Sequence, residues 1–176
     1  FIVFLFLALT GICIYFSKNN LKRGLMLLGV SLLLTLGTYI VGIIINDVNI
    51  TIMFGVLHCI ALALIIISLL ELGLKNFKYN KYIYLVIGII MVSIGIYFYH
   101  NYIFVSYEGE NIFLLFFHIL LGDKLAGYDC FPFLLYGGEI FIGVFLGKLL
   151  YKDKKSLFNF NYHNNVITFI GRHSLI

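Results

Sequence analysis

The stretch that decides the fold is IMFGVLHCIALALIIISLLE, residues 52–71, an almost continuous run of apolar side chains with one histidine, His58, near its start. A helix of about 20 residues crosses the roughly 30 Å of hydrocarbon in a bilayer. Hydrophobic residues make up 62% of the chain and charged residues 11%, whereas soluble domains carry about 25% charged residues. Because the apolar runs do not alternate with polar residues, they indicate membrane-spanning helices rather than barrel strands.

Similar runs recur along the chain and predict an all-α, polytopic transmembrane bundle. We predict five full spans, at 1–17, 24–45, 53–72, 82–99 and 131–150, and the start of a further span near 166. The segment IFLLFFHILL, residues 112–121, is too short to cross and is predicted as an outer interfacial or re-entrant helix. We treat residues 1–176 as a single membrane-embedded domain. Because both ends lie in apolar runs, we expect truncation at both ends and at least one upstream helix.

Charged residues alternate between the predicted loops. Ten of the twelve basic residues lie in or beside the first, third and fifth loops: Lys18, Lys22, Arg23, Lys75, Lys78, Lys81, Lys148, Lys152, Lys154 and Lys155. The second and fourth loops carry Asp47, Glu108, Glu110, Asp123 and Asp129 against Lys124 alone. The positive-inside rule therefore predicts loops near 18–23, 73–81 and 151–165 in the cytoplasm and loops near 46–52 and 100–130 outside. We expect the protein to be integral to the plasma (inner) membrane. The net charge of +4 is explained by this topology and by contact with membrane lipid, so no nucleic-acid partner is expected.

Small and polar residues form stripes on two of the predicted helices. Glu139, Gly143 and Gly147 share one face, and the two glycines form a G-x-x-x-G pattern that predicts close packing on a neighbouring helix. A carboxylate on that face is either a functional group or a structural hydrogen-bonding group near the wetted outer end. Ser31, Thr35, Thr38 and Gly42 form a second stripe, which we interpret as interhelical contact, and Gly88 and Gly95 as the same kind of packing device.

Three histidines lie at or near membrane depth: His58, His118 and His173. Each is either a hydrogen-bonded packing residue or a group for catalysis or proton-coupled transport, and spacing alone leaves both open. The cysteines and histidines lack the spacing of a metal site, so no metal is expected.

Four segments, in this order, resemble the catalytic domain of the heparan-α-glucosaminide N-acetyltransferase family, in its prokaryotic branch: LKRGLMLLGVSLLLTLGTYIV, FGVLHCIALALIIISLLE, YDCFPFLLYGGEIFIGVFLGKLLY and FIGRHSLI. The resemblance covers essentially the whole chain. It implies transfer of an acetyl group from cytoplasmic acetyl-CoA, as co-substrate, to a sugar across the membrane. The family's catalytic histidine follows its first helix, which would precede residue 1, so this role is carried onto no residue here.

The resemblance and the chemistry of acetyl transfer suggest site residues, each with a structural alternative. Candidate donor-binding residues are His58, Lys22, Arg23, Arg172 and His173. Lys22, Arg23 and Arg172 are cationic partners for the CoA phosphates, whereas we expect His58 to face the bundle interior as a hydrogen-bonding contact in a tunnel that accommodates CoA. The positive-inside rule alone would also supply Lys22 and Arg23, and Arg172 could snorkel to the interface. Supporting candidates for catalysis are His118, Asp129 and Glu139. Asp129 could bind a sugar hydroxyl or could simply cap the helix that begins near Pro132.

Together these features predict a membrane-embedded acyltransferase that acetylates a cell-envelope glycan or amino sugar. A small-molecule or proton-coupled transporter and a non-catalytic scaffold stay open as alternatives. The chain lacks the pseudo-repeats and interrupted helices typical of transporters, whereas a scaffold would not need buried Glu, His and Arg. The sequence leaves open whether the protein forms a homo-oligomer.

Overall fold

The computed structural model of the protein describes residues 2–17, 19–46, 51–52, 54–74, 80–101, 117, 119–121, 131–152 and 155–156. The helices are α1 (Ile2–Phe16), α2 (Asn20–Ile45), α3 (Val56–Gly73), α4 (Asn80–His100), the π-helical turn η2 (Phe133–Gly137) and α6 (Gly138–Leu150). Two short strands, β1 (Tyr151–Lys152) and β2 (Lys155–Ser156), pair as an antiparallel hairpin. All other elements in the described residues are helices, so the predicted all-α membrane bundle is confirmed.

Four of the five predicted spans are long and apolar enough to cross a membrane: α2, α3, α4 and the continuous η2–α6 helix. The helix predicted at 1–17 is present as α1, but its 15 residues extend only about 22 Å at 1.5 Å per residue. Of the predicted short outer helix, residues 117 and 119–121 are described and are helical. The start of a span near 166 lies outside the described residues.

The boundaries of α2 differ from the prediction at its N-terminus. The helix begins at Asn20, so Lys22 and Arg23 belong to its first turn instead of the preceding loop. It ends at Ile45, and Asn46 adopts a left-handed conformation with φ of 58°. The Asn46 backbone N–H donates to the carbonyls of Gly42 and Ile43, which satisfies part of the open helix end.

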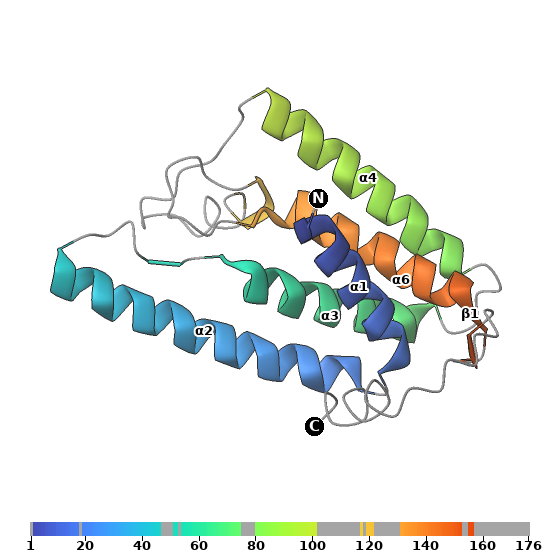
Figure 1. The fold of residues 1–176 in the computed structure, drawn as a ribbon, viewed down its shortest axis with the longest axis horizontal. Helices are drawn as coiled ribbons and strands as arrows, with labels where there is room; N and C mark the ends of the chain where they lie inside the picture. Colours follow the sequence, from blue (N-terminus) through green and yellow to red (C-terminus); the bar gives the residue numbers. More distant parts are fainter. Residues whose placement is uncertain are drawn as a thin grey trace.

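The helices form a layered bundle in which α2 and α4 lie on the two outer sides, with α3 and α6 between them (Figure 1). α2 packs on α3, while α1 and α4 both pack on α6. The outer face of α2 presents large apolar side chains along its length, such as Leu33 and Ile44, which are 70% and 74% exposed. Such a face suits contact with lipid or with other apolar helices.

Glycines allow the closest helix contacts, as the sequence predicted. The G-x-x-x-G face of α6 packs on α1, where Gly143 lies against Gly11. On the other side of α6, Gly88 of α4 lies against Ile142 and Gly95 lies against Leu135 of η2. Small residues let helix backbones approach within van der Waals contact, which is a main source of association in membranes.

All lysine and arginine side chains that the structure describes lie at one end of the bundle. Lys22 and Arg23 are in the first turn of α2, Lys81 begins α4, and Lys148 lies near the end of α6. We call this the basic end. α1 and α3 also end there, since the α1–α2 connection shares a cavity with the last turns of α3. The gathering of cations at one end agrees with the predicted alternation of the loops.

Candidate functional site

His58 lies in the first turn of α3 and is only 5% exposed. Its Nε2 lies 3.1 Å from the hydroxyl oxygen of Thr35 in α2, and its ring centroid lies 5.7 Å from that of Phe54. The histidine is therefore buried at the α2–α3 interface and bonded across it. The interior position expected for this ring is found.

The contacts of Thr35 indicate which ring nitrogen of His58 carries the proton. The Thr35 hydroxyl oxygen lies 2.9 Å from the carbonyl oxygen of Ile52 and 3.2 Å from that of Ser31. Carbonyl oxygens only accept, and a hydroxyl has a single proton to donate. The shortest of these contacts assigns the hydroxyl proton to the carbonyl of Ile52, so Nε2 of His58 carries a proton and donates it to Thr35.

The polar stripe on α2 makes the interhelical contacts that its pattern predicted. Thr38 accepts a hydrogen bond of 3.2 Å from the backbone N–H of Ile52, one turn beyond the Thr35–His58 contact. Ser31 is fully buried. The stripe thus fixes the segment that leads into α3, and with it the position of the imidazole.

Glu139 lies in the first turn of α6 and is 8% exposed. Its Oε2 has no hydrogen-bond partner among the described residues. A structural hydrogen bond through Oε2 is thus not found in the described part of the chain, and the functional interpretation of Glu139 stays open.

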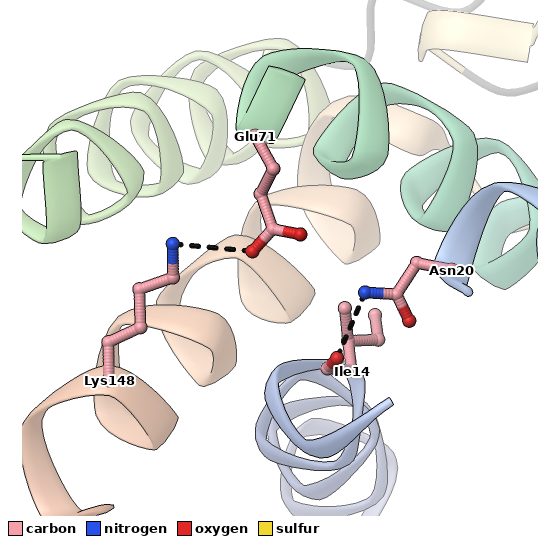
Figure 2. Close-up of polar contacts among 4 residues, drawn as sticks. All are labelled: Ile14, Asn20, Glu71 and Lys148. Atoms are coloured by element: carbon pink, nitrogen blue, oxygen red, sulfur yellow. Dashed lines mark hydrogen bonds and ion pairs between the residues drawn. The ribbon is translucent and has the colours of Figure 1, made fainter. Parts of the chain in front are cut away.

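A cavity of about 680 Å³ lies at the basic end, between the α1–α2 connection and the last turns of α3. Six of its eight lining residues are polar or charged, namely Ser17, Asn19, Asn20, Lys22, Ser68 and Glu71, and the other two are Leu21 and Leu72. Asn20 is buried and its side-chain amide donates a 3.0 Å hydrogen bond to the carbonyl of Ile14, as Figure 2 shows. This bond satisfies a carbonyl at the end of α1 and fixes one wall of the cavity.

The Lys-Arg-Gly sequence at the start of α2 has a clear structural basis. A Cβ atom on Gly24 would lie 2.9 Å from Cγ1 of Ile65, so only glycine lets α2 approach α3 here. Lys22 lines the large cavity. Arg23 lines a second cavity of about 140 Å³ between α1, α2 and α3. The close approach thus directs two cations towards two neighbouring cavities.

An ion pair at the basic end was not found by sequence reasoning. Nζ of Lys148 lies 3.3 Å from Oε1 of Glu71 and 4.3 Å from the ring centroid of Tyr84. The sequence did carry a signal for this pair, namely the depth of each residue in the membrane, because Glu71 and Lys148 lie in the last turns of two helices that end on the same side. An acid and a base at equal depth in parallel helices are candidates for pairing.

The predicted site residues fall into separate places. Lys22 and Arg23 lie together at the basic end, whereas His58 contacts α2 at Thr35, about 18 Å further along that helix at 1.5 Å per residue. Glu139 lies at the start of α6, away from the basic end. His118, Asp129, Arg172 and His173 lie outside the described residues. Within the described part of the chain, no three His, Cys, Asp or Glu side chains gather as a metal site would require.

Comparison with known proteins identifies a family for the whole chain. A family model described as heparan-alpha-glucosaminide N-acetyltransferase, catalytic, matches residues 1–176. Comparisons with curated proteins and with solved structures give no match. The match spans both the basic end and the His58 region. The chain therefore belongs to the heparan-alpha-glucosaminide N-acetyltransferase catalytic family, a family of membrane acetyltransferases.

Proposed function

We propose that the protein takes an acetyl group from acetyl-CoA, which enters at the basic end, and transfers it to a cell-envelope glycan or amino sugar at the opposite end. The observation that carries this proposal is the cavity of about 680 Å³ at the basic end. It combines a cationic side chain with several hydrogen-bonding groups, the set that a nucleotide-bearing anion requires. Family membership supplies the reaction type.

The spacing of the polar groups suits an elongated donor. Acetyl-CoA carries its phosphates at one end and its thioester at the other, joined by a flexible arm. Lys22 and Arg23 lie in the first turn of α2, where a helix N-terminus adds a favourable field for anions. His58 lies about 18 Å deeper along α2. A donor held by its phosphates at the basic end would therefore extend its thioester towards the His58 region.

The transfer itself needs a base and oxyanion donors. The base removes a proton from the acceptor hydroxyl or amine, the acceptor attacks the thioester carbonyl, and the tetrahedral oxyanion collapses to expel CoA as its thiolate, which then takes up a proton. We propose that this base is a histidine, as the family resemblance implies, and we assign the role to no residue named here. Here His118, Asp129 and Glu139 are proposed as supporting groups on the acceptor side, with Arg172 and His173 proposed beside Lys22 and Arg23 for the donor.

The orientation follows from the positive-inside rule. The basic end faces the cytoplasm, where acetyl-CoA is made, and the loops near 46–52 and 100–130 face outwards to the acceptor. Asp129 in the outer loop is then a sugar-binding residue. Asp129→Asn is expected to lower acetyl transfer without unfolding the protein, and normal turnover by this variant would remove Asp129 from the acceptor site.

The test is calorimetric titration of acetyl-CoA into the full-length protein purified in detergent. We expect a Kd on the micromolar scale, about −8 kcal/mol. Lys22→Gln should weaken binding about tenfold through loss of a phosphate contact. Lys81→Gln is the matched control, because Lys81 lies at the same end over the Tyr82 ring but does not line the cavity.

His58→Ala and Arg172→Ala extend the same titration to the remaining donor-binding candidates. Weakened binding by either variant, with thermal unfolding unchanged, would support the donor path from the basic end to His58. Absence of acetyl-CoA binding by the folded wild-type protein would overturn the proposal and favour a transporter or a scaffold.

A further inference from the structure

Glu71 occupies a position that is unfavourable for binding an anion. It lines the basic-end cavity together with Lys22, and it is 34% exposed. Among the described residues, it is the only acidic side chain at the basic end, since Glu139 lies at the start of α6. A bare carboxylate in this wall would repel the phosphates of a donor in the cavity.

Lys148 lies on the other side of the same carboxylate. Figure 2 shows Glu71 between Lys148 on α6 and Asn20 at the cavity wall. Nζ of Lys148 is 3.3 Å from Oε1 of Glu71, and the lysine side chain is only 12% exposed. The ammonium group also lies over the ring of Tyr84, 4.3 Å from its centroid, and Tyr84 is fully buried. Two contacts therefore hold the ammonium group against Glu71.

We propose that Lys148 neutralises Glu71 and thereby sets the affinity of the basic-end cavity for the phosphate-bearing part of the donor. Lys148 acts through Glu71, because it does not line the cavity itself. The inference rests on the proposed acetyl-CoA site and adds to it a positioning pair that tunes the cavity's charge. If the pair merely fastens α3 to α6, changes in it would alter stability but not the electrostatics of binding.

The two interpretations of the Glu71–Lys148 pair, charge tuning and a purely structural contact, predict different effects of Glu71→Gln on CoA affinity. Removal of the acid leaves Lys148 unneutralised beside the cavity, so CoA should bind several-fold more tightly than it does to the wild type. A purely structural pair predicts equal or weaker binding. This variant retains the shape of the side chain, and its affinity is measured on full-length protein whose thermal unfolding is recorded in parallel.

Lys148→Met supplies the reverse change. It keeps an unbranched side chain over Tyr84 but leaves Glu71 bare, so CoA should bind roughly tenfold more weakly, a loss of about 1.4 kcal/mol. Lys148→Met combined with Glu71→Gln should return the affinity to near the wild-type value, because the unpaired acid is gone. Lys81→Met, which removes a lysine from the same end without touching Glu71, is the matched control and should leave the affinity near wild type.

Salt and ligand provide two further readouts. The defect of Lys148→Met should shrink as ionic strength rises, because screening weakens the repulsion. Pantetheine, which lacks the phosphates, should bind the wild type and Lys148→Met equally. Unchanged CoA affinity in Lys148→Met, failure of the double variant to recover, or equal or weaker binding by Glu71→Gln would each overturn the inference. If folded wild-type protein does not bind CoA, the proposed donor site itself fails, a result distinguishable from these.

Discussion

Gly11 of α1 and Gly143 of α6 lie so close together that neither position accepts a side chain. A Cβ atom on Gly11 would lie 2.7 Å from Cα of Gly143, and one on Gly143 would lie 2.9 Å from Cα of Gly11. Contacts this short between Cβ and a backbone atom force the helices apart. Because α6 also carries Glu139 and Lys148, the α1–α6 contact fixes the helix that connects the two ends of the bundle.

Gly143→Ala should therefore destabilise the bundle. The added methyl group meets backbone rather than a flexible side chain, so we expect a loss of about 1–3 kcal/mol in the free energy of unfolding. The measurement is denaturation in detergent followed by circular dichroism. Gly37→Ala on α2 is the control, because no atom lies within 4 Å of a Cβ there and alanine is the better helix former. Equal stabilities for the two variants would contradict the close packing.

The sequence predicted the fold well because membrane helices are specified mainly by local composition. Length and hydropathy located α2, α3, α4 and the η2–α6 helix, since the bilayer demands about 20 apolar residues with internal hydrogen bonds. The glycine spacing predicted which face of α6 packs closely. The start of α2 was harder, because Lys22 and Arg23 are helical despite their charge, and charge had been treated as the mark of a loop.

The site was less predictable because it depends on which helices become neighbours. His58 was identified as interior, but its partner Thr35 lies on a stripe that was interpreted only as packing. The Glu71–Lys148 pair was missed, since it joins helices far apart in sequence and periodicity within one helix carries no such information. Lys22 and Arg23 were chosen on charge, and the cavities beside them depend on how α2 packs against α1 and α3.

Thr35→Val should change the tautomer of His58. The variant keeps the shape of Thr35 but removes the oxygen that accepts the Nε2–H, so the ring loses the contact that favours this tautomer. We expect the ¹⁵N shifts of the wild-type ring to show protonation at Nε2 and those of the variant to show a mixture or the Nδ1–H form.

The matched control for this change is Thr10→Val, because the Thr10 hydroxyl bonds only to its own helix, at the carbonyl of Phe6, among the contacts described. This variant should leave the His58 shifts unchanged. Thr35→Val should also cost roughly 0.6–1.7 kcal/mol of stability, the range for interhelical hydrogen bonds in membrane bundles. A wild-type ring protonated at Nδ1 would contradict the assigned hydrogen bond.

Asn20→Ala should weaken both the end of α1 and the cavity wall. The buried amide of Asn20 bonds to the carbonyl of Ile14, which also accepts from the backbone N–H of Ser17, so the expected cost is that of one hydrogen bond, about 0.5–1.5 kcal/mol. Acetyl-CoA binding should fall with it, because the wall of the basic-end cavity loses its anchor. Asn101→Ala is the control: its amide makes a similar 2.8 Å bond to Tyr97, but at an exposed site. If Asn20→Ala unfolds with the same free energy as the wild type, the end of α1 does not depend on this hydrogen bond.

Glu139→Gln separates the two interpretations of the buried carboxylate. The substitution preserves size and removes the charge, whose burial in the membrane is costly. Because Oε2 has no hydrogen-bond partner in the described part of the chain, we expect the free energy of unfolding to stay equal or rise. A structural acid would instead show a clear loss of stability on the same denaturation measurement.

Acetyl transfer is the second readout for Glu139→Gln. If the carboxylate serves the reaction, kcat should fall at least tenfold while acetyl-CoA affinity stays near wild type, because Glu139 lies away from the basic-end cavity. Glu71→Gln provides the contrast, since it breaks an ion pair and acts on donor affinity. A stable Glu139→Gln variant with full activity would remove Glu139 from the site. If the variant is stable but no longer turns over, the carboxylate is needed for acetyl transfer and not for folding.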